Sequence, residues 1–177
     1  ASLHKIGYKT MAIKPIVTLS SKEAEILRKK LAPVKFNSTS ITSIIEDIVD
    51  TMHNAPGIGL AANQIGYDKR IIAVDVPTGE VSEKNLLVII NPVIIKESGK
   101  IKYKEGCLSL PEFDEKIPRC AEIIVEGYDV NWNKLEIEAN GLLSVVLQHE
   151  IDHLNGILIV DRVSKLKRNL YIKKQKQ

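Results

Sequence analysis

Apolar residues recur at helical spacing in three parts of the chain. The segment 141–155 predicts a helix that ends at Gly156, since glycine is common just past a helix C-terminus. The segment 19–31 (LSSKEAEILRKKL) predicts another, because Ser20 and Glu23 match a capping box. The segment 39–54 (TSITSIIEDIVDTMHN) predicts a third, with Thr39 or Ser40 as N-cap. Its apolar stripe comprises Ile41, Ile44, Ile45, Ile48, Val49 and Met52.

Between the second and the last of these helices lie segments rich in Val and Ile, separated by Gly, Asn or Pro, which predict β-strands. The sequence NWNK at 131–134 predicts a hairpin turn. Because the strands lie between helices and do not alternate with them, we expect an α+β fold. The predicted strands are 70–76, 86–95, 100–106, 121–130 and 134–139.

The length and composition of the chain indicate a single domain. It has 177 residues, of which 44% are hydrophobic and 27% charged, as in an ordinary globular protein with its own core. No apolar run is long enough for a membrane-spanning helix. Residues 1–10 lack the apolar stretch of a secretory signal, and one interpretation is a disordered or vector-derived prefix.

The net charge of +3 is concentrated at the C-terminal end. Residues 163–177 contain six basic side chains and no acid, so subtracting six charges from +3 leaves −3 for the rest. A basic tail of this kind is either the solvated face of a helix or a surface that docks on a polyanion. The six residues are Lys165, Lys167, Arg168, Lys173, Lys174 and Lys176.

The stretch LQHEIDHLNG, 147–156, carries the first candidate for chemistry. His149 and His153 are four residues apart, so on a helix they share a face and can bind one metal. Glu150 lies about 100° round the helix from His149, where a general base can flank the metal without binding it. The two histidines point into apolar surroundings, where an unpartnered pair is costly. The apolar residues on their stripe are Leu142, Val145 and Val146.

A third ligand has to be sought upstream. Zinc endopeptidases with this motif take their third ligand from further along the chain. The 24 residues after His153 contain no His or Glu and a single acid, Asp161. The endopeptidase interpretation is therefore incomplete.

Cys107, in the segment EGCLSLP, is the favoured third ligand, because the neighbouring Gly106 lets the backbone come close. His4, near a terminus, and His53, at a helix end, are weaker alternatives. Cys120 is expected to be a small buried apolar residue. No disulfide is expected in a chain of this size without a secretory signal.

The segment GIGLAANQIG, 57–66, is the third unusual stretch. Gly57 and Gly59 allow a close approach by a ligand or another backbone, and Gln64 offers an uncharged donor. By itself such a segment favours a structural turn.

In this order and spacing, GIGLAANQ, EGCLS and QHEIDHLNG closely resemble peptide deformylases, enzymes that remove the formyl group from the initiator methionine of nascent chains. The resemblance extends from LRKKLAPV to HLNGILIVDRV and implies antiparallel or mixed sheets packed around a central metal-binding helix. Two positions differ from many relatives. Asn63 stands where Pro or Thr is frequent. Asp114 stands where several relatives have an Arg that contacts the peptide backbone.

The resemblance implies a divalent metal on Cys107, His149 and His153, with Fe²⁺ as the native ion and Zn²⁺, Ni²⁺ or Co²⁺ as substitutes. Hydroxide formed from a water on that metal would attack the formyl carbon, with Glu150 as general base and then acid. The oxyanion would be stabilised by the Gln64 side chain and the Leu108 backbone N–H.

The resemblance also implies how the substrate binds. The backbone of Ile58, Gly59 and Glu105, beside Gly106, would hold the formylmethionyl peptide as an added strand. Arg119 would pair with Glu105 and hold it in place. The methionine pocket would be formed by Ile58, Tyr103, Leu142, Val145 and Val146. We expect a bacterial cytoplasmic protein, with an organellar source as the alternative, and a basic tail that docks on the ribosome.

Two other kinds of metal protein stay open on residue pattern alone. A blue-copper electron carrier also combines Cys with two His, but it expects an axial Met. Only Met11 and Met52 exist, and neither is near the ligands in sequence. A structural metal module would need no acid at Glu150.

Overall fold

The computed structural model describes residues 12–77 and 85–177. Residues 1–10, which were assigned as a prefix and include His4, lie outside this part, as does Met11. In chain order the elements are η1 (Ala24–Arg28), α1 (Ile41–Asn54), β1 (Gly59–Ala61), η2 (Ala62–Ile65), β2 (Ile71–Asp75), β3 (Leu86–Ser98), β4 (Ile101–Cys107), β5 (Leu110–Arg119), β6 (Glu122–Tyr128), β7 (Lys134–Asn140), α2 (Gly141–Leu154), η3 (Ile159–Arg162) and α3 (Lys165–Gln175).

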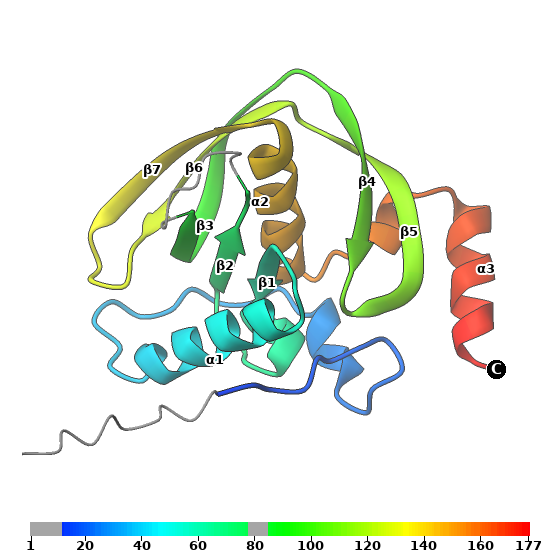
Figure 1. Ribbon diagram of the computed structural model, residues 1–177, viewed down its shortest axis with the longest axis horizontal. Coiled ribbons are helices and arrows are strands. Elements are labelled where there is room, and N and C mark those ends of the chain that lie inside the picture. The colour runs from blue at the N-terminus through cyan, green and yellow to red at the C-terminus, as the bar shows by residue number, and fades with distance from the viewer. Residues whose placement is uncertain (1–11, 78–84) are drawn as a thin grey trace, which may run out of the picture.

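Helix α2 stands between two antiparallel sheets (Figure 1). One sheet has five strands in the order β1-β2-β3-β6-β7, and the other is the β4–β5 hairpin. Every strand pair is antiparallel. The architecture confirms the α+β prediction and the expectation of a central helix that carries the histidine motif.

The five-stranded sheet is covered by a helix on each face, which explains why β2 is apolar without alternation. Ile72 and Val74 of β2 belong to the core under α2, together with Val146, Leu147, Ile151 and Leu154. Ile71 and Ala73 of the same strand belong to the core under α1, which contributes Ile41, Ile44, Ile48 and Met52. Successive side chains of a strand point to opposite faces, so both sets of β2 residues are buried.

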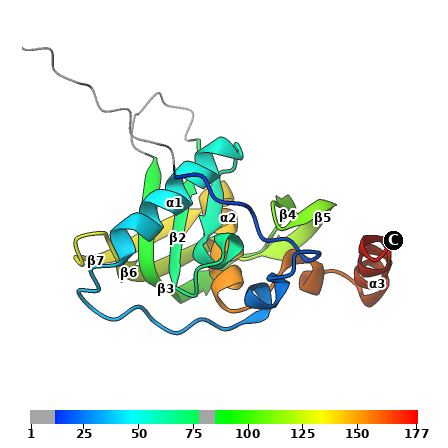
Figure 2. The same ribbon diagram turned by 90° about the horizontal axis from the view of Figure 1, so that it is seen from below.

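A third core cluster joins the β4–β5 hairpin to the C-terminal region. Leu110, Phe113 and Ile117 of β5 pack there with Leu158, Ile159, Val160 and Tyr171. Helix α3 lies along the outer side of β5, away from the five-stranded sheet (Figures 1 and 2). Its helical structure agrees with the expectation for the basic tail. None of the described helices is long and apolar enough to cross a membrane.

The predicted helix at 19–31 is wrong. Only the short 3₁₀ segment η1 forms there, and its N-cap residue Glu23 makes no capping bond. The Leu19 N–H donates to Ser109 C=O and the Leu31 N–H donates to Leu154 C=O. These tertiary bonds hold both ends of the segment and override its helix propensity.

The sheet predictions were right in place but incomplete. Strand β3 continues to Ser98, beyond the predicted end, and β5 occupies the segment PEFDEKIPR, which was not predicted as a strand. The hairpin turn between β6 and β7 is confirmed, with Asp129 Oδ1 accepting from the Asn131 and Asn133 N–H groups. Gly156 follows α2 with φ +73°, the left-handed conformation expected for the residue past a helix end.

Candidate active site

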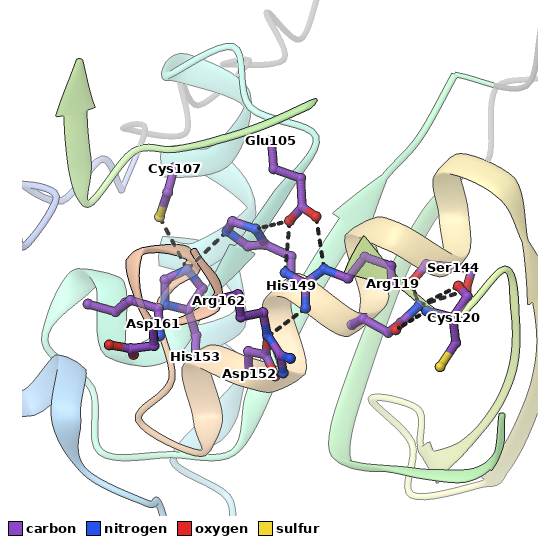
Figure 3. A network of polar contacts seen from close by, with 12 residues as sticks. Glu105, Cys107, Arg119, Cys120, Ser144, His149, Asp152, His153, Asp161 and Arg162 are labelled. Atoms are coloured by element: carbon purple, nitrogen blue, oxygen red, sulfur yellow. Dashed lines mark hydrogen bonds and ion pairs between the residues drawn. The ribbon is translucent and has the colours of Figure 1, made fainter. Parts of the chain in front are cut away.

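His149, His153 and Cys107 meet at the centre of the molecule, between α2 and the end of β4. Their ligand atoms all lie within 4.8 Å of one another. His153 Nε2 is 3.3 Å from Cys107 Sγ and 3.2 Å from His149 Nε2 (Figure 3). Among the described residues this is the one group of three or more His, Cys, Asp or Glu side chains that could hold a metal ion. Cys107, upstream of the motif, completes it as predicted.

The β4–β5 hairpin brings Cys107 to α2. Register runs regularly from Ile101 paired with Arg119 to Gly106 paired with Asp114, and then shifts so that Cys107 pairs with Leu110. This shift interrupts the regular ladder between β4 and β5 directly at Cys107. The cysteine therefore leaves the strand pattern at the point where β4 approaches the histidines.

A series of connected charged side chains holds the His149 ring in place. His149 Nδ1 is 2.9 Å from Glu105 Oε1, and Arg119 binds both oxygens of Glu105 at 2.8 Å. The guanidinium of Arg119 also donates to Asp152 at 2.6 Å, and Asp152 accepts two more bonds from Arg162 (Figure 3). Each carboxylate is thus neutralised by an arginine, and the His149 ring is fixed with Nε2 towards the metal group.

The 3₁₀ segment η2 approaches the group from the opposite side. Gln64 Nε2 lies 3.1 Å from Ser109 Oγ and 3.7 Å from Cys107 Sγ, while its Oε1 accepts from the Ala61 N–H at 3.0 Å. The bond to Ala61 sets the amide orientation, so that the NH₂ end faces the cysteine. The neighbouring Asn63 is fully buried, and its amide donates to the His153 carbonyl at 2.7 Å.

Glu150 lies on the other flank of the histidines, against β1. It is 4% exposed, and its Oε2 has no hydrogen-bond partner. Only a glycine fits opposite it: a Cβ on Gly59 would lie 2.6 Å from Glu150 Oε1 and 2.9 Å from Val146 Cγ1. The close approach that the glycine segment predicted is therefore made, by Gly59 in particular.

A cavity of about 610 Å³ opens onto this group. Every predicted substrate-binding residue lines it, as do Gln64, Cys107, Leu108, His149 and Glu150. The floor is apolar, with Val145 and Val146 buried and Leu142 half-buried, whereas Ile58 and Tyr103 stand at the exposed rim. The predicted substrate-binding residues are Ile58, Gly59, Tyr103, Glu105, Gly106, Leu142, Val145 and Val146.

Burial and charge shift the acid–base properties of these groups. Burial tends to raise the pKa of Glu105, but hydrogen bonds from Arg119 and His149 outweigh it and lower that pKa. Burial also lowers the pKa of His153 well below its usual value, so this ring is neutral and can offer a lone pair. Burial raises the pKa of Glu150 to about 7, close to the value that suits proton transfer at neutral pH.

The alternatives for the third ligand lie elsewhere. His53 is exposed and pairs with Asp75 at 2.8 Å. Cys120 is half-buried beside the core under α2, and both cysteines are free thiols, as expected. Met52 belongs to α1 and is buried in the core between α1 and the five-stranded sheet, on the face opposite α2.

Sequence reasoning missed several residues of the site. The pairing of Arg119 with Glu105 is confirmed, but Asp152 and Arg162, which extend it, were not identified. Asp152 lies inside the motif HEIDH, one residue before a histidine, and that position was its only signal. Asp114 lines the cavity and pairs with Lys104 at 3.2 Å.

Comparison with known proteins agrees with this geometry. The family model described as polypeptide deformylase matches residues 13–169. A peptide deformylase of Thermodesulfovibrio yellowstonii is 47% identical over 152 residues, which cover 86% of this chain and 92% of the relative. A solved structure of the Ehrlichia chaffeensis peptide deformylase in complex with actinonin has a TM-score of 0.84 at 40% identity, and covers 94% of this chain and 97% of its own.

A third comparison involves a bound peptide. The Met-Ala-Ser-bound class I type b peptide deformylase of Acinetobacter baumannii has a TM-score of 0.79 at 30% identity, covering 87% of this chain and 100% of its own. The matches extend over nearly the whole chain and include all three motif segments. The chain therefore belongs to the polypeptide deformylase family, metal-dependent hydrolases that remove the N-formyl group from nascent polypeptides.

Proposed function

We propose that the chain hydrolyses the formyl amide of N-formylmethionyl peptides at a divalent metal held by Cys107, His149 and His153, and releases formate. The observation that carries the proposal is the meeting of these three ligand atoms within 4.8 Å beside a cavity that also exposes Glu150.

The residues fit a catalytic transition metal by their donor chemistry. One thiolate and two imidazoles are ligands for Fe²⁺, Zn²⁺, Ni²⁺ or Co²⁺, and three protein ligands beside a cavity are typical of a catalytic site with an open position. We propose Fe²⁺ as the native ion. When bound, a metal of this kind lowers the pKa of a coordinated water and so supplies hydroxide near neutral pH.

Glu150 is proposed as the proton carrier. It is buried beside His149 without being part of the three-residue group, and its Oε2 has no partner. Its raised pKa lets it hold a proton during the reaction, although a cation nearby would lower that pKa by favouring the carboxylate. Glu150 takes the proton of the attacking water and gives it to the departing amine.

Gln64 and Leu108 are proposed to stabilise the oxyanion that forms at the formyl carbon. The bond from Ala61 to Gln64 Oε1 keeps the amide NH₂ directed into the site. Leu108 lines the cavity directly after Cys107, so its backbone N–H is the second donor. Removing one such donor costs roughly 10²–10³ in rate in other enzymes.

Specificity follows from the shape of the cavity. Gly59 lies so close to Glu150 that a Cβ there would be 2.6 Å from Glu150 Oε1. We propose that this crowding admits a formyl group beside the metal and hinders an acetyl group. The apolar residues Leu142, Val145 and Val146 accept the methionine side chain, with Ile58 and Tyr103 at the rim. β1 and β4 are sheet edges, and backbone groups of Ile58, Gly59 and Glu105 can pair with the substrate as an added strand.

The test is formate release from formyl-Met-Ala under anaerobic conditions, with acetyl-Met-Ala as the control. We expect turnover of the formyl substrate only, by the protein loaded with Fe²⁺ or Ni²⁺. Equal turnover of the acetyl peptide, or none of the formyl peptide, would reject the proposal. The Fe²⁺ form should lose activity in air faster than the Ni²⁺ form, because iron promotes oxidation of an accessible thiolate.

We also propose a bacterial cytoplasmic location and docking of α3 on the ribosome. The relatives named above are bacterial, and α3 carries five of the six basic residues of the C-terminal tail, with Lys176 directly after it. Deleting residues 163–177 should weaken ribosome binding in a salt-dependent manner, because polyanion contacts weaken as salt rises. Binding unchanged by the deletion would contradict this part of the proposal.

A further inference from the structure

Asn63 contacts the metal-binding helix without being part of the catalytic set. It is fully buried on η2, directly before Gln64. Its amide donates to the His153 carbonyl at 2.7 Å, and the Gly156 N–H donates to the same carbonyl at 3.1 Å. The last carbonyls of a helix have no partner within the helix, so these two donors fix the final turn of α2, which carries His153.

Two buried atoms beside this contact lack partners. In the described part of the chain, the buried side-chain atoms without a hydrogen bond are Asn63 Oδ1, Glu150 Oε2 and His153 Nδ1. Glu150 Oε2 belongs to the proposed proton carrier. Of the other two, Asn63 Oδ1 is a hydrogen-bond acceptor. His153 Nδ1 is a donor when the ring binds metal through Nε2. They lie on residues that are already hydrogen-bonded to each other, and buried polar groups left unpaired are costly.

The two histidines differ in whether Nδ1 has a hydrogen-bond partner. His149 Nδ1 has Glu105 Oε1 at 2.9 Å, which fixes its tautomer and ring orientation. For His153 the one unpartnered buried acceptor on a neighbouring residue of η2 is the Asn63 amide oxygen. A single buried water between two polar atoms is an ordinary feature of protein interiors.

We propose that Asn63 is the positioning residue for His153: its N–H holds the His153 carbonyl, and its Oδ1 accepts the Nδ1–H of the ring through one buried water. The inference rests on the metal site of the proposed function. Consecutive residues of η2 then hold two of the three ligands, Asn63 acting on His153 and Gln64 on Cys107.

The test compares Asn63→Leu with a matched variant, Gln148→Leu. Both remove a buried amide that bonds to the backbone of α2, but Gln148 bonds to Ser144 and Cys120 and not to a ligand. The first measurement is the rate at which the Zn²⁺-loaded protein loses its metal to excess chelator. The second is the solvent exchange of the His153 Nδ1–H, observed by NMR in the Zn²⁺ form.

We expect Asn63→Leu to release Zn²⁺ about 10–100-fold faster than wild type, the usual effect of losing a partner of a ligand. Gln148→Leu should stay within twofold, and exchange of the His153 Nδ1–H should accelerate only in Asn63→Leu. If Asn63→Leu does not fold, Asn63→Thr is tested in its place, and its rate of Zn²⁺ release is compared with that of wild type in the same way.

Equal release rates for Asn63→Leu and wild type would overturn the inference, as would an equal acceleration by Gln148→Leu. Both results leave the proposed function standing as long as Cys107→Ser abolishes tight Zn²⁺ binding. A wild-type chain that binds no metal would overturn the inference together with the proposed function.

Discussion

Helices α2 and α3 follow each other closely in sequence but differ in how the molecule holds them. α2 buries ten of its fourteen residues, including Gln148, Glu150, Asp152 and His153. α3 buries only Tyr171 among its eleven residues. Most polar side chains inside α2 have partners, apart from Glu150 Oε2 and His153 Nδ1, whereas those of α3 face water. The chemistry of this protein therefore lies where polar groups are buried, and basic charge alone marks a surface.

The largest expected effect is on turnover and comes from α2. Glu150→Gln removes the proposed proton carrier and keeps its shape, so kcat should fall by roughly 10²–10⁴, the range for general acid–base catalysis. Metal content should stay at the wild-type level, because Glu150 is not among the three ligands. The control is Glu138→Gln, an exposed change on β7. Turnover above one tenth of wild type would count against the assigned role.

A second contrast sets a buried ion pair against an exposed one. Arg119→Met leaves Glu105 buried without its arginine and Asp152 with Arg162 alone, which should lower the free energy of unfolding by about 3–5 kcal/mol. Arg168→Met on α3 breaks a pair of 3.5 Å with Asp161, where Arg168 is 45% exposed, and should cost at most about 1 kcal/mol. Urea unfolding measures both. Similar losses would mean that α2 and α3 do not differ in the way proposed.

The third prediction compares Gly59, which faces α2, with Gly57, which does not. Gly59→Ala places a Cβ against Glu150 and Val146, so formate release should fall by about 10²-fold, as expected when reacting groups are misplaced. Gly57→Ala makes ordinary contacts, at 3.4 Å with Leu108 Cδ1 and at 3.6 Å with the Gly59 and Met52 carbonyl oxygens, so its turnover should stay within a few-fold of wild type. Steady-state kinetics of formate release measure both variants. Equal losses of turnover would show that the close approach at Gly59 is unimportant.

The smallest effect is expected on α3. Tyr171 donates to the Pro111 carbonyl at 2.9 Å and packs edge-on against Phe113, with ring centroids 4.9 Å apart. Tyr171→Phe keeps the ring contact and loses one hydrogen bond, which should cost about 0.5–1.5 kcal/mol in thermal unfolding. Formate release should not change. A large loss of turnover would show that α3 contributes to the active site through Phe113.

The local sequence pattern was sufficient to predict some elements of the fold and insufficient for others. The stripe from Ile41 to Met52 and the motif around His149 are local, and helices formed at both. The segment at 19–31 has the propensity of a helix, but backbone bonds to Ser109 and Leu154 decide its shape. Those partners are distant in sequence, so no local pattern contains them.

The site follows the same division. His149, His153 and Glu150 share one helical turn, so their arrangement could be predicted from spacing. Cys107 was favoured because no downstream residue could complete the group, and its family motif then agreed. The contributions of Asp152, Arg162 and Asn63 depend on contacts across the fold, which a single sequence does not reveal.

The distance along the chain between Cys107 and His153 has a consequence for folding. They are 46 residues apart, in a hairpin and in a helix that belong to different layers. A metal that binds both ties these layers together as a cross-link does, and it binds the folded chain in preference to the unfolded one. The metal-free protein should therefore melt at a lower temperature, with amide protons of β4 and β5 exchanging first. The supply of that metal would then set the amount of folded protein in the cell as well as its catalytic rate.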